Sequence, residues 1–200
     1  ILSDKLVANL HMAYKAYLIL EENEEDEKSE EAIEQCDNVF FANEEEIAKM
    51  NVLANAVVLT SQGTSFMLAG EEFLRTKGGD HNSYTSSYEV NELDYSLKVK
   101  HLDMMEIYKK LIWLKQNNAA LGNKNAGAFQ VNTYDNDASV IFYDLGDYWV
   151  FHHNGAGGDK TIDTAIIRGT VYLDTLNPTN VGAVPTILKP YQTIIAYKKA

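Results

Sequence analysis

Hydrophobic residues recur at helical spacing in three stretches of the first 120 residues. Residues 1–20 place leucine, alanine and tyrosine at three- and four-residue steps, which predicts an amphipathic helix. Residues 43–62 predict a second helix: Asn43 can cap it, three glutamates follow at the positive end of the helix dipole, and Gly63 can end it. Residues 101–116 repeat the pattern and predict a third helix.

Two segments between these helices differ in pattern. Residues 64–69 form a short apolar run bounded by Gly63 and Gly70, which predicts a strand buried on both faces. Residues 77–94 are polar, contain Gly and Asn, and follow neither period, so they predict a long loop. Loops of this length in compact domains are commonly functional.

From about Gly127 onward, short apolar or alternating runs are separated by Asp, Asn and Gly, which are hairpin signals. The expected strands lie within residues 128–134, 139–143, 148–153, 165–173, 185–188 and 193–197. Trp149 alternates with Phe151 and is expected in the core. The pattern predicts an antiparallel β-sandwich of roughly 70 residues.

Composition narrows the possible partners. The 200 residues are 46% hydrophobic, enough for one domain or two small ones, and the net charge of −12 argues against nucleic acid. Cys36 is the only cysteine, which excludes an intramolecular disulfide and a thiolate metal cluster. No apolar stretch approaches the ~20 residues that span a bilayer, so no membrane segment is expected. The acidic residues 21–34 are typical of a solvated helix surface or a flexible loop.

Residues 53–77, LANAVVLTSQGTSFMLAGEEFLRTK, resemble the last helix and eighth strand of the (β/α)8 barrel in bacterial type I pullulanases of glycoside hydrolase family 13. There a Thr-Ser-Gln-Gly turn leads into a strand that closes with Gly-Glu-Glu-Phe. Residues 82–84 and 90–95 resemble the family's Asn-Ser-Tyr and Val-Asn-Gln-x-Asp-Trp segments. The resemblance is strongest over residues 44–115 and departs at 63–66, where the family has Gly-x-Pro-Phe.

The resemblance implies an α+β fold: the end of a (β/α)8 barrel with an acidic insertion in residues 1–121, then an antiparallel C-terminal β-sandwich in residues 122–200. The parent would be a bacterial starch- and glycogen-debranching enzyme that hydrolyses α-1,6-glucosidic bonds in pullulan-type α-glucans. No cofactor or metal is expected. An extracellular or cell-surface location is favoured over the cytoplasm.

Retaining glycosidases need two carboxyl groups about 5–5.5 Å apart. The resemblance places both, and the aspartate of a His-Asp-Asn motif, ahead of Ile1, so the chain alone is expected to be inactive and to hold no catalytic residue. Glu71 and Glu72 would point to opposite sides of an extended segment. A salt bridge to Arg75 or Lys77 and a place in the substrate pocket both stay open for these glutamates.

Four further substrate-side candidates lie on the loop that follows: His81, Asn82, Tyr84 and Asn91. Amides and phenols can recognise sugar hydroxyls, and an aromatic ring can pack on a sugar ring. The same Asn and Ser residues also suit ordinary turns.

Two other motifs favour structural roles. His152 and His153 project to opposite faces of a strand, which argues against a shared metal ion. Residues 155–158, Gly-Ala-Gly-Gly, precede strand-like residues and not a helix, so a hairpin connection is expected in place of a phosphate loop.

Two other functions remain: an independent non-catalytic protein that binds α-glucans or another subunit, and a structural module without ligand. A lone barrel strand is an edge that seeks partners. The chain is therefore expected to cover residues 64–69 with the helices 1–20 and 44–62, to form a homodimer, or to associate with the rest of the barrel.

Overall fold

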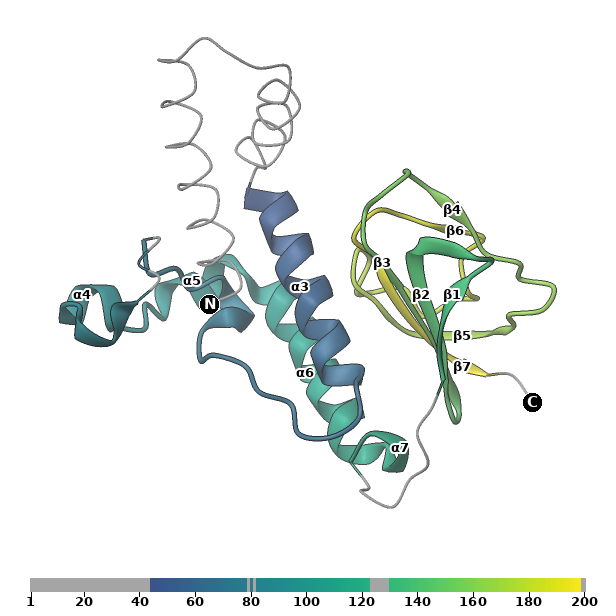
Figure 1. The fold of residues 1–200 in the computed structure, drawn as a ribbon, viewed down its shortest axis with the longest axis horizontal. Helices are drawn as coiled ribbons and strands as arrows, with labels where there is room; N and C mark the ends of the chain where they lie inside the picture. Colours follow the sequence, from purple (N-terminus) through teal and green to yellow (C-terminus); the bar gives the residue numbers. More distant parts are fainter. Residues whose placement is uncertain (1–43, 79, 81, 123–129, 199–200) are drawn as a thin grey trace, which may run out of the picture. The chain divides into compact units, whose positions relative to one another are not determined.

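The computed structural model describes residues 44–78, 80, 82–122 and 130–198 (Figure 1). The chain divides into two compact units, one formed by Ile1–Asn51 and Leu68–Lys100 and the other by Val52–Met67 and His101–Ala200. The helix expected over residues 1–20, the acidic stretch 21–34, the Asn43 cap and Cys36 lie outside the described residues.

The two other predicted helices are confirmed. Helix α3 spans Glu44–Thr60 and helix α6 spans Leu102–Asn117. The apolar positions of α6 recur at three- and four-residue steps and form its buried face: Met104, Ile107, Tyr108, Leu111 and Leu114. A single turn, α7, follows at Ala119–Gly122.

The strand predicted over residues 64–69 is wrong. The segment is irregular, and the Phe66 side chain is 85% exposed. Its start is tied to helix ends: Gly63 N–H donates to Leu121 O (3.2 Å), and Ser65 Oγ donates to Val58 O (3.0 Å). A strand needs a neighbouring strand for its backbone hydrogen bonds, and no described strand pairs with this segment.

Within residues 68–100, the described part of the first unit contains four short elements joined by turns. They are the 3₁₀ turns η1 (Glu71–Phe73) and η2 (Ser83–Thr85) and the helices α4 (Tyr88–Asn91) and α5 (Ser96–Lys100). The predicted loop 77–94 thus contains η2 and α4, each about one turn long. Phe73 is buried and packs on Tyr95, with ring centroids 5.9 Å apart.

The second unit contains two antiparallel sheets. The first has the order β1-β2-β3-β7-β5 and the second pairs β4 with β6. The strands are β1 (Val131–Tyr134), β2 (Asp137–Leu145), β3 (Tyr148–His153), β4 (Lys160–Thr161), β5 (Gly169–Asp174), β6 (Ile187–Leu188) and β7 (Thr193–Lys198). Each of the six predicted runs overlaps a strand, whereas β4 was not predicted.

One buried cluster joins the two sheets. Its members come from both sheets and their connections: Val140, Phe151, Ile162, Ile167, Val184, Leu188, Ile194 and Ala196. Trp149 is half-buried against this cluster, so the expectation that Phe151 and Trp149 face the core is confirmed.

The other face of the five-stranded sheet meets helices of the same unit. Tyr172 on β5 donates its hydroxyl proton to Lys110 O on α6 (3.0 Å), and Lys110 Nζ donates to Pro178 O (2.9 Å). Because β3 and β7 are covered on both faces, they read as nearly continuous buried runs.

Candidate functional site

The segment with the sequence-based candidates begins with a tight turn at Gly70. Gly70 has φ 99°, and a Cβ there would lie 2.6 Å from Arg75 Cβ, so only glycine fits without strain. Gly70 O accepts hydrogen bonds from Phe73 N–H (3.2 Å) and Arg75 N–H (2.9 Å). The turn fixes the positions of Glu71 and Glu72 between these residues.

Glu71 and Glu72 therefore lie in a 3₁₀ turn, and the extended conformation expected for them is wrong. With three residues per turn, their side chains project about 120° apart. Glu71 is buried, whereas Glu72 is half-exposed and its Oε2 accepts the Gly70 N–H (2.9 Å). The two carboxyl groups have different surroundings and are not a matched pair.

Arg75 holds the two ends of the segment together. Its buried guanidinium donates to three backbone carbonyls: Nε to Glu92 O (3.1 Å), Nη1 to Ala69 O (3.4 Å) and Nη2 to Asn91 O. A guanidinium has five N–H donors in a fixed fork, so this one side chain can join the backbone near Ala69 to the backbone at Asn91 and Glu92. Arg75 is thus a structural clamp.

Asn91 completes a second bridge inside the loop. Its Nδ2 donates to Ser83 O (2.7 Å) and also to Ser86 O and Ser87 O (both 3.2 Å). Its Oδ1 accepts from Lys77 Nζ (3.1 Å), which donates to Ser83 Oγ as well (2.5 Å). Both ends of the amide are engaged within the loop, which makes Asn91 a positioning residue.

The exposed candidates lie on the outer edge of this frame. Tyr84 is on η2 and 82% exposed, and Asn82 next to it is exposed. Asp80 fixes the loop beneath them, because Oδ1 accepts Asn82 N–H (2.9 Å) and Oδ2 accepts the Ser86 hydroxyl. His81 lies outside the described residues. The arrangement presents a phenol ring and an amide from a hydrogen-bonded loop.

Sequence reasoning missed the clamp at Arg75 and the Lys77–Ser83–Asn91 bridge. The sequence signal for these roles was weak, because an arginine shortly after a glycine and an asparagine in a loop are both common and have many roles. Only the fold brings residues 70–77 beside 83–92.

The two histidines make separate contacts. His152 is fully buried; its Nε2 lies 2.8 Å from Tyr143 Oη and 3.2 Å from Thr60 Oγ1, and its Nδ1 lies 2.8 Å from Thr193 Oγ1. Burial lowers the pKa of His152 to about 3 and raises the pKa of Tyr143. A neutral imidazole here links the end of α3 to β2, β3 and β7.

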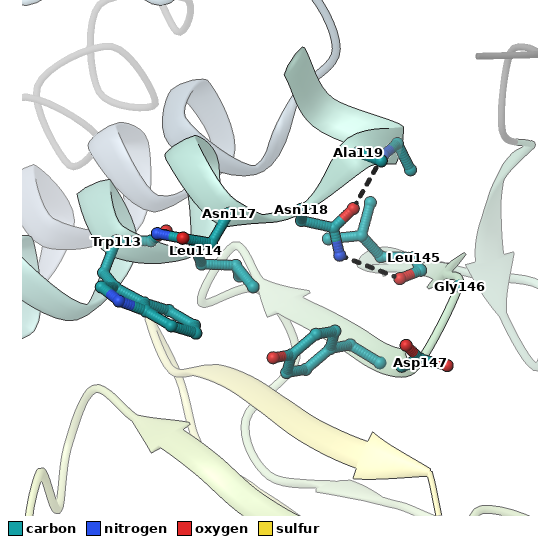
Figure 2. Close-up of a pocket in the computed structure, with 10 residues that line it drawn as sticks. Trp113, Leu114, Asn117, Asn118, Ala119, Leu145, Gly146 and Asp147 are labelled. Carbon is teal, nitrogen blue, oxygen red and sulfur yellow. Dashed lines mark hydrogen bonds between the residues drawn. The ribbon is translucent and has the colours of Figure 1, made fainter. Parts of the chain in front are cut away.

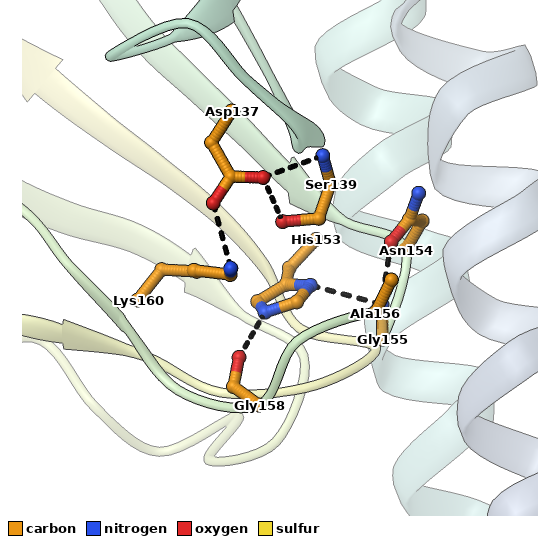
Figure 3. A network of polar contacts seen from close by, with 8 residues as sticks. All are labelled: Asp137, Ser139, His153, Asn154, Gly155, Ala156, Gly158 and Lys160. Carbon is orange, nitrogen blue, oxygen red and sulfur yellow. Dashed lines mark hydrogen bonds and ion pairs between the residues drawn. The ribbon is translucent and has the colours of Figure 1, made fainter.

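His153 organises a loop on the other side of β3 (Figure 3). Its Nδ1 accepts Gly155 N–H (2.9 Å), so its Nε2 carries the proton that is donated to Gly158 O (2.7 Å). The loop connects β3 in one sheet to β4 in the other, so the expected hairpin at 155–158 is wrong. Glycines with positive φ allow this crossing.

The same loop ends at an ion pair that carries no catalytic geometry. Lys160 Nζ lies 2.6 Å from Asp137 Oδ2, while Asp137 Oδ1 accepts from the backbone and hydroxyl of Ser139 (Figure 3). Lys160 and Ser139 together hold the pKa of Asp137 well below its usual range. Within the described residues, no cluster of three His, Cys, Asp or Glu side chains could hold a metal ion.

Comparisons of the sequence and of the structure with known proteins both find pullulanases. The chain is 36% identical over 78 residues to the pullulanase of Bacillus subtilis (strain 168), covering 39% of this chain and 11% of that protein. It matches the crystal structure of a pullulanase from Anoxybacillus sp. LM18-11, complexed with maltotetraose, with a TM-score of 0.67 and 28% identity, over 79% of this chain. The chain is pullulanase-like.

The pullulanase-like chain also shares 34% identity over 62 residues with a glycogen operon protein GlgX homolog from Mycobacterium bovis, covering 31% of this chain and 9% of the relative. It spans 24% of the Anoxybacillus chain, so it corresponds to a minor part of the proteins it matches. No family profile matches the chain. Among the described residues, no helix has the length and apolar character required to cross a membrane.

Proposed function

We propose that this pullulanase-like chain is the C-terminal part of a starch- and glycogen-debranching enzyme that hydrolyses α-1,6-glucosidic bonds in pullulan-type α-glucans. Residues 1–121 contribute the end of the catalytic (β/α)8 barrel and residues 122–200 form its C-terminal β-sandwich.

The observation that carries the proposal is the loop frame of Gly70–Asp94 in a chain similar to pullulanases. Arg75 and Asn91 consolidate the loop, and Tyr84 and Asn82 project from it, exposed. In the proposed enzyme Tyr84 packs on a sugar ring and Asn82 hydrogen-bonds sugar hydroxyls. Asn91 keeps the loop in place, and buried Glu71 supports the wall of the substrate site from behind.

The two catalytic carboxyl groups belong to other parts of the proposed parent. Glu71 and Glu72 project about 120° apart from one 3₁₀ turn, and Glu72 is hydrogen-bonded to Gly70 N–H. Such a pair cannot flank one glycosidic bond from both sides, as retaining hydrolysis requires. The 200-residue chain alone is therefore inactive, and release of reducing sugar from pullulan by the pure chain would overturn this part of the proposal.

A second candidate is a non-catalytic protein that binds α-glucans by itself. The exposed Tyr84, which needs no catalytic partner to bind a sugar ring, favours it. Two observations separate the two candidates: the upstream extent of the reading frame that encodes this chain, and affinity electrophoresis of its product in a glycogen-containing gel. A frame that begins near Ile1, with a product that glycogen retards, supports the binding protein. A frame that extends upstream through the other barrel strands supports the debranching enzyme.

A further inference from the structure

A second concave site lies in the other compact unit, away from the Gly70–Asp94 loop in sequence. It is a pocket of about 380 Å³ between the end of α6, α7 and the β2–β3 turn (Figure 2). This volume falls within the roughly 300–1,000 Å³ typical of small-molecule sites. Its lining residues include Trp113, Asn117, Asn118, Asp147 and Tyr148.

The aromatic part of the pocket comes from Trp113 and Tyr148. Trp113 lies beside the buried face of α6 and is 49% exposed, with its ring tilted against Tyr172 at a centroid distance of 6.1 Å. Tyr148 is buried in contact with Tyr172 and Tyr197. Burial raises the pKa of Tyr148, so its hydroxyl keeps its proton. The ring of Trp113 is thus supported on one side and open on the other.

The polar part is held in place by the backbone. Gly146 has φ 68° and forms the tight β2–β3 turn with Asp147. Asn118 Nδ2 donates to Leu145 O (3.4 Å), and Lys198 N–H donates to Asp147 O (2.9 Å). These bonds fix the main chain on both sides of the turn, from which Asp147 lines the pocket (Figure 2).

Asn117 supplies a second acceptor from the helix side. Its Nδ2 donates to Trp113 O (2.8 Å), which orients the side chain, and the residue lines the pocket. Among the described residues that line the pocket, Asp147 carries the only charged side chain. A carboxylate disfavours anionic ligands such as phosphates and favours donors of hydrogen bonds.

We propose that this pocket is a saccharide-binding subsite in which Trp113 stacks on a sugar ring while Asp147 and Asn117 accept hydrogen bonds from its hydroxyls. The combination of an open aromatic face with fixed acceptors suits a neutral, hydroxyl-rich ligand. That the saccharide is an α-linked glucan rests on the proposed function. The subsite would bind a chain of the polysaccharide with residues that are remote in sequence from the Tyr84 loop.

The test uses the full 200-residue chain and maltotetraose, followed by the tryptophan indole N–H signals in two-dimensional NMR. The chain has two tryptophans, and Trp149→Phe assigns the two signals. The Trp113 signal is expected to shift and saturate as maltotetraose is added at millimolar concentration, whereas the Trp149 signal, whose Nε1–H donates to Arg168 O (3.3 Å), stays in place. Absence of a saturable Trp113 shift would overturn the proposal.

Calorimetric titration of variants identifies the contacts. Trp113→Ala is expected to weaken maltotetraose binding about 10-fold or more, and Asp147→Asn and Asn117→Ala about 3- to 10-fold each. Ile112→Ala, a partly exposed neighbour on α6 outside the pocket, is the matched control and should leave binding unchanged. Equal affinities for Trp113→Ala and Ile112→Ala would contradict the assignment.

The result is independent of the debranching activity. Tyr84→Ala should leave the Trp113 titration unchanged, because Tyr84 does not line the pocket. If the parent hydrolyses pullulan but Trp113 does not respond, the subsite is wrong and the proposed function stands. If Trp113 responds but the parent is inactive on pullulan, the subsite stands and the debranching proposal fails.

Discussion

The side chains discussed above fall into two groups: those that make hydrogen bonds inside the molecule and those with rings exposed to solvent. Arg75, Asn91 and His152 have their polar atoms engaged inside the molecule. Tyr84 and Trp113 expose large parts of their rings. Substitutions in the two groups should therefore affect different observables, stability for the first and binding for the second.

His152 makes the stability depend on pH. Its pKa is about 3 in the folded chain against the ordinary 6.5, so the unfolded chain binds the extra proton below pH 6.5. Its contribution is complete above pH 6.5 and is lost as the pH falls towards 3, at up to about 1.4 kcal/mol per pH unit. We expect His152→Gln to reduce the slope of the unfolding free energy between pH 4.5 and 6.5, measured by urea denaturation.

The control for this prediction is His101→Gln, at a partly exposed position. That variant should keep the slope of the unsubstituted chain. The same slope in the His152→Gln variant and the unsubstituted chain would contradict the assignment of this pH dependence to His152.

Alanine substitutions at Asn91 and Tyr84 should differ in their effect on stability. Asn91→Ala removes four hydrogen bonds of the loop and is expected to destabilise it by about 1–3 kcal/mol, with faster hydrogen exchange over residues 70–94. Tyr84→Ala, at an 82% exposed position, should change stability by less than about 0.5 kcal/mol.

In the proposed parent enzyme, Tyr84→Ala should raise KM for pullulan several-fold, because a ring contact is lost. Thr85→Ala, also exposed on η2, is the matched control and should leave KM unchanged. An unchanged KM in Tyr84→Ala would remove Tyr84 from the substrate site.

The elements show where sequence patterns are sufficient. The period of α6 predicted residues 101–116 as a helix and the structure has Leu102–Asn117, because one face of this helix is buried. The strands after Gly127 were located for the same reason: the five-stranded sheet has covered faces that demand apolar residues. Strand β4 was missed because Lys160–Thr161 is only two residues long and carries no period.

Patterns fail where the partner decides the structure. The apolar residues 64–69 fit a buried strand in composition, but no described strand pairs with them, and Phe66 is exposed. The Glu71–Phe73 turn was equally hidden, since it depends on the positive φ of Gly70 and on the Arg75 side chain packed against it. Of the candidate site, the location of Asn82, Tyr84 and Asn91 on one loop was accessible from sequence; the roles of Arg75 and Asn91 were not.

The Gly70 turn can be tested as an element. Gly70→Ala should destabilise the chain by more than Gly63→Ala, since both have positive φ but only the Cβ at Gly70 meets another residue. We expect about 1 kcal/mol for the strain alone at Gly63 and at least about 1 kcal/mol more at Gly70. If thermal denaturation shows the same loss of stability for Gly70→Ala and Gly63→Ala, the packing of Gly70 against Arg75 is unimportant.

At the scale of the whole molecule, the chain matches pullulanases over most of its length but spans only 24% of the Anoxybacillus chain. The exposed apolar residues outside the sheets, such as Phe66, Tyr88 and Val99, are consistent with surfaces covered by other parts of the proposed parent. The homodimer expected from a lone strand loses its basis, because residues 64–69 form no strand in the described structure.

Reducing-sugar release from pullulan by the product of the complete reading frame that encodes this chain tests the central claim most directly, with the 200-residue chain assayed alongside at equal molarity. We predict steady release by the complete product and none by the 200-residue chain. Release by the 200-residue chain, or no release by a complete product that includes the other barrel strands, would contradict it.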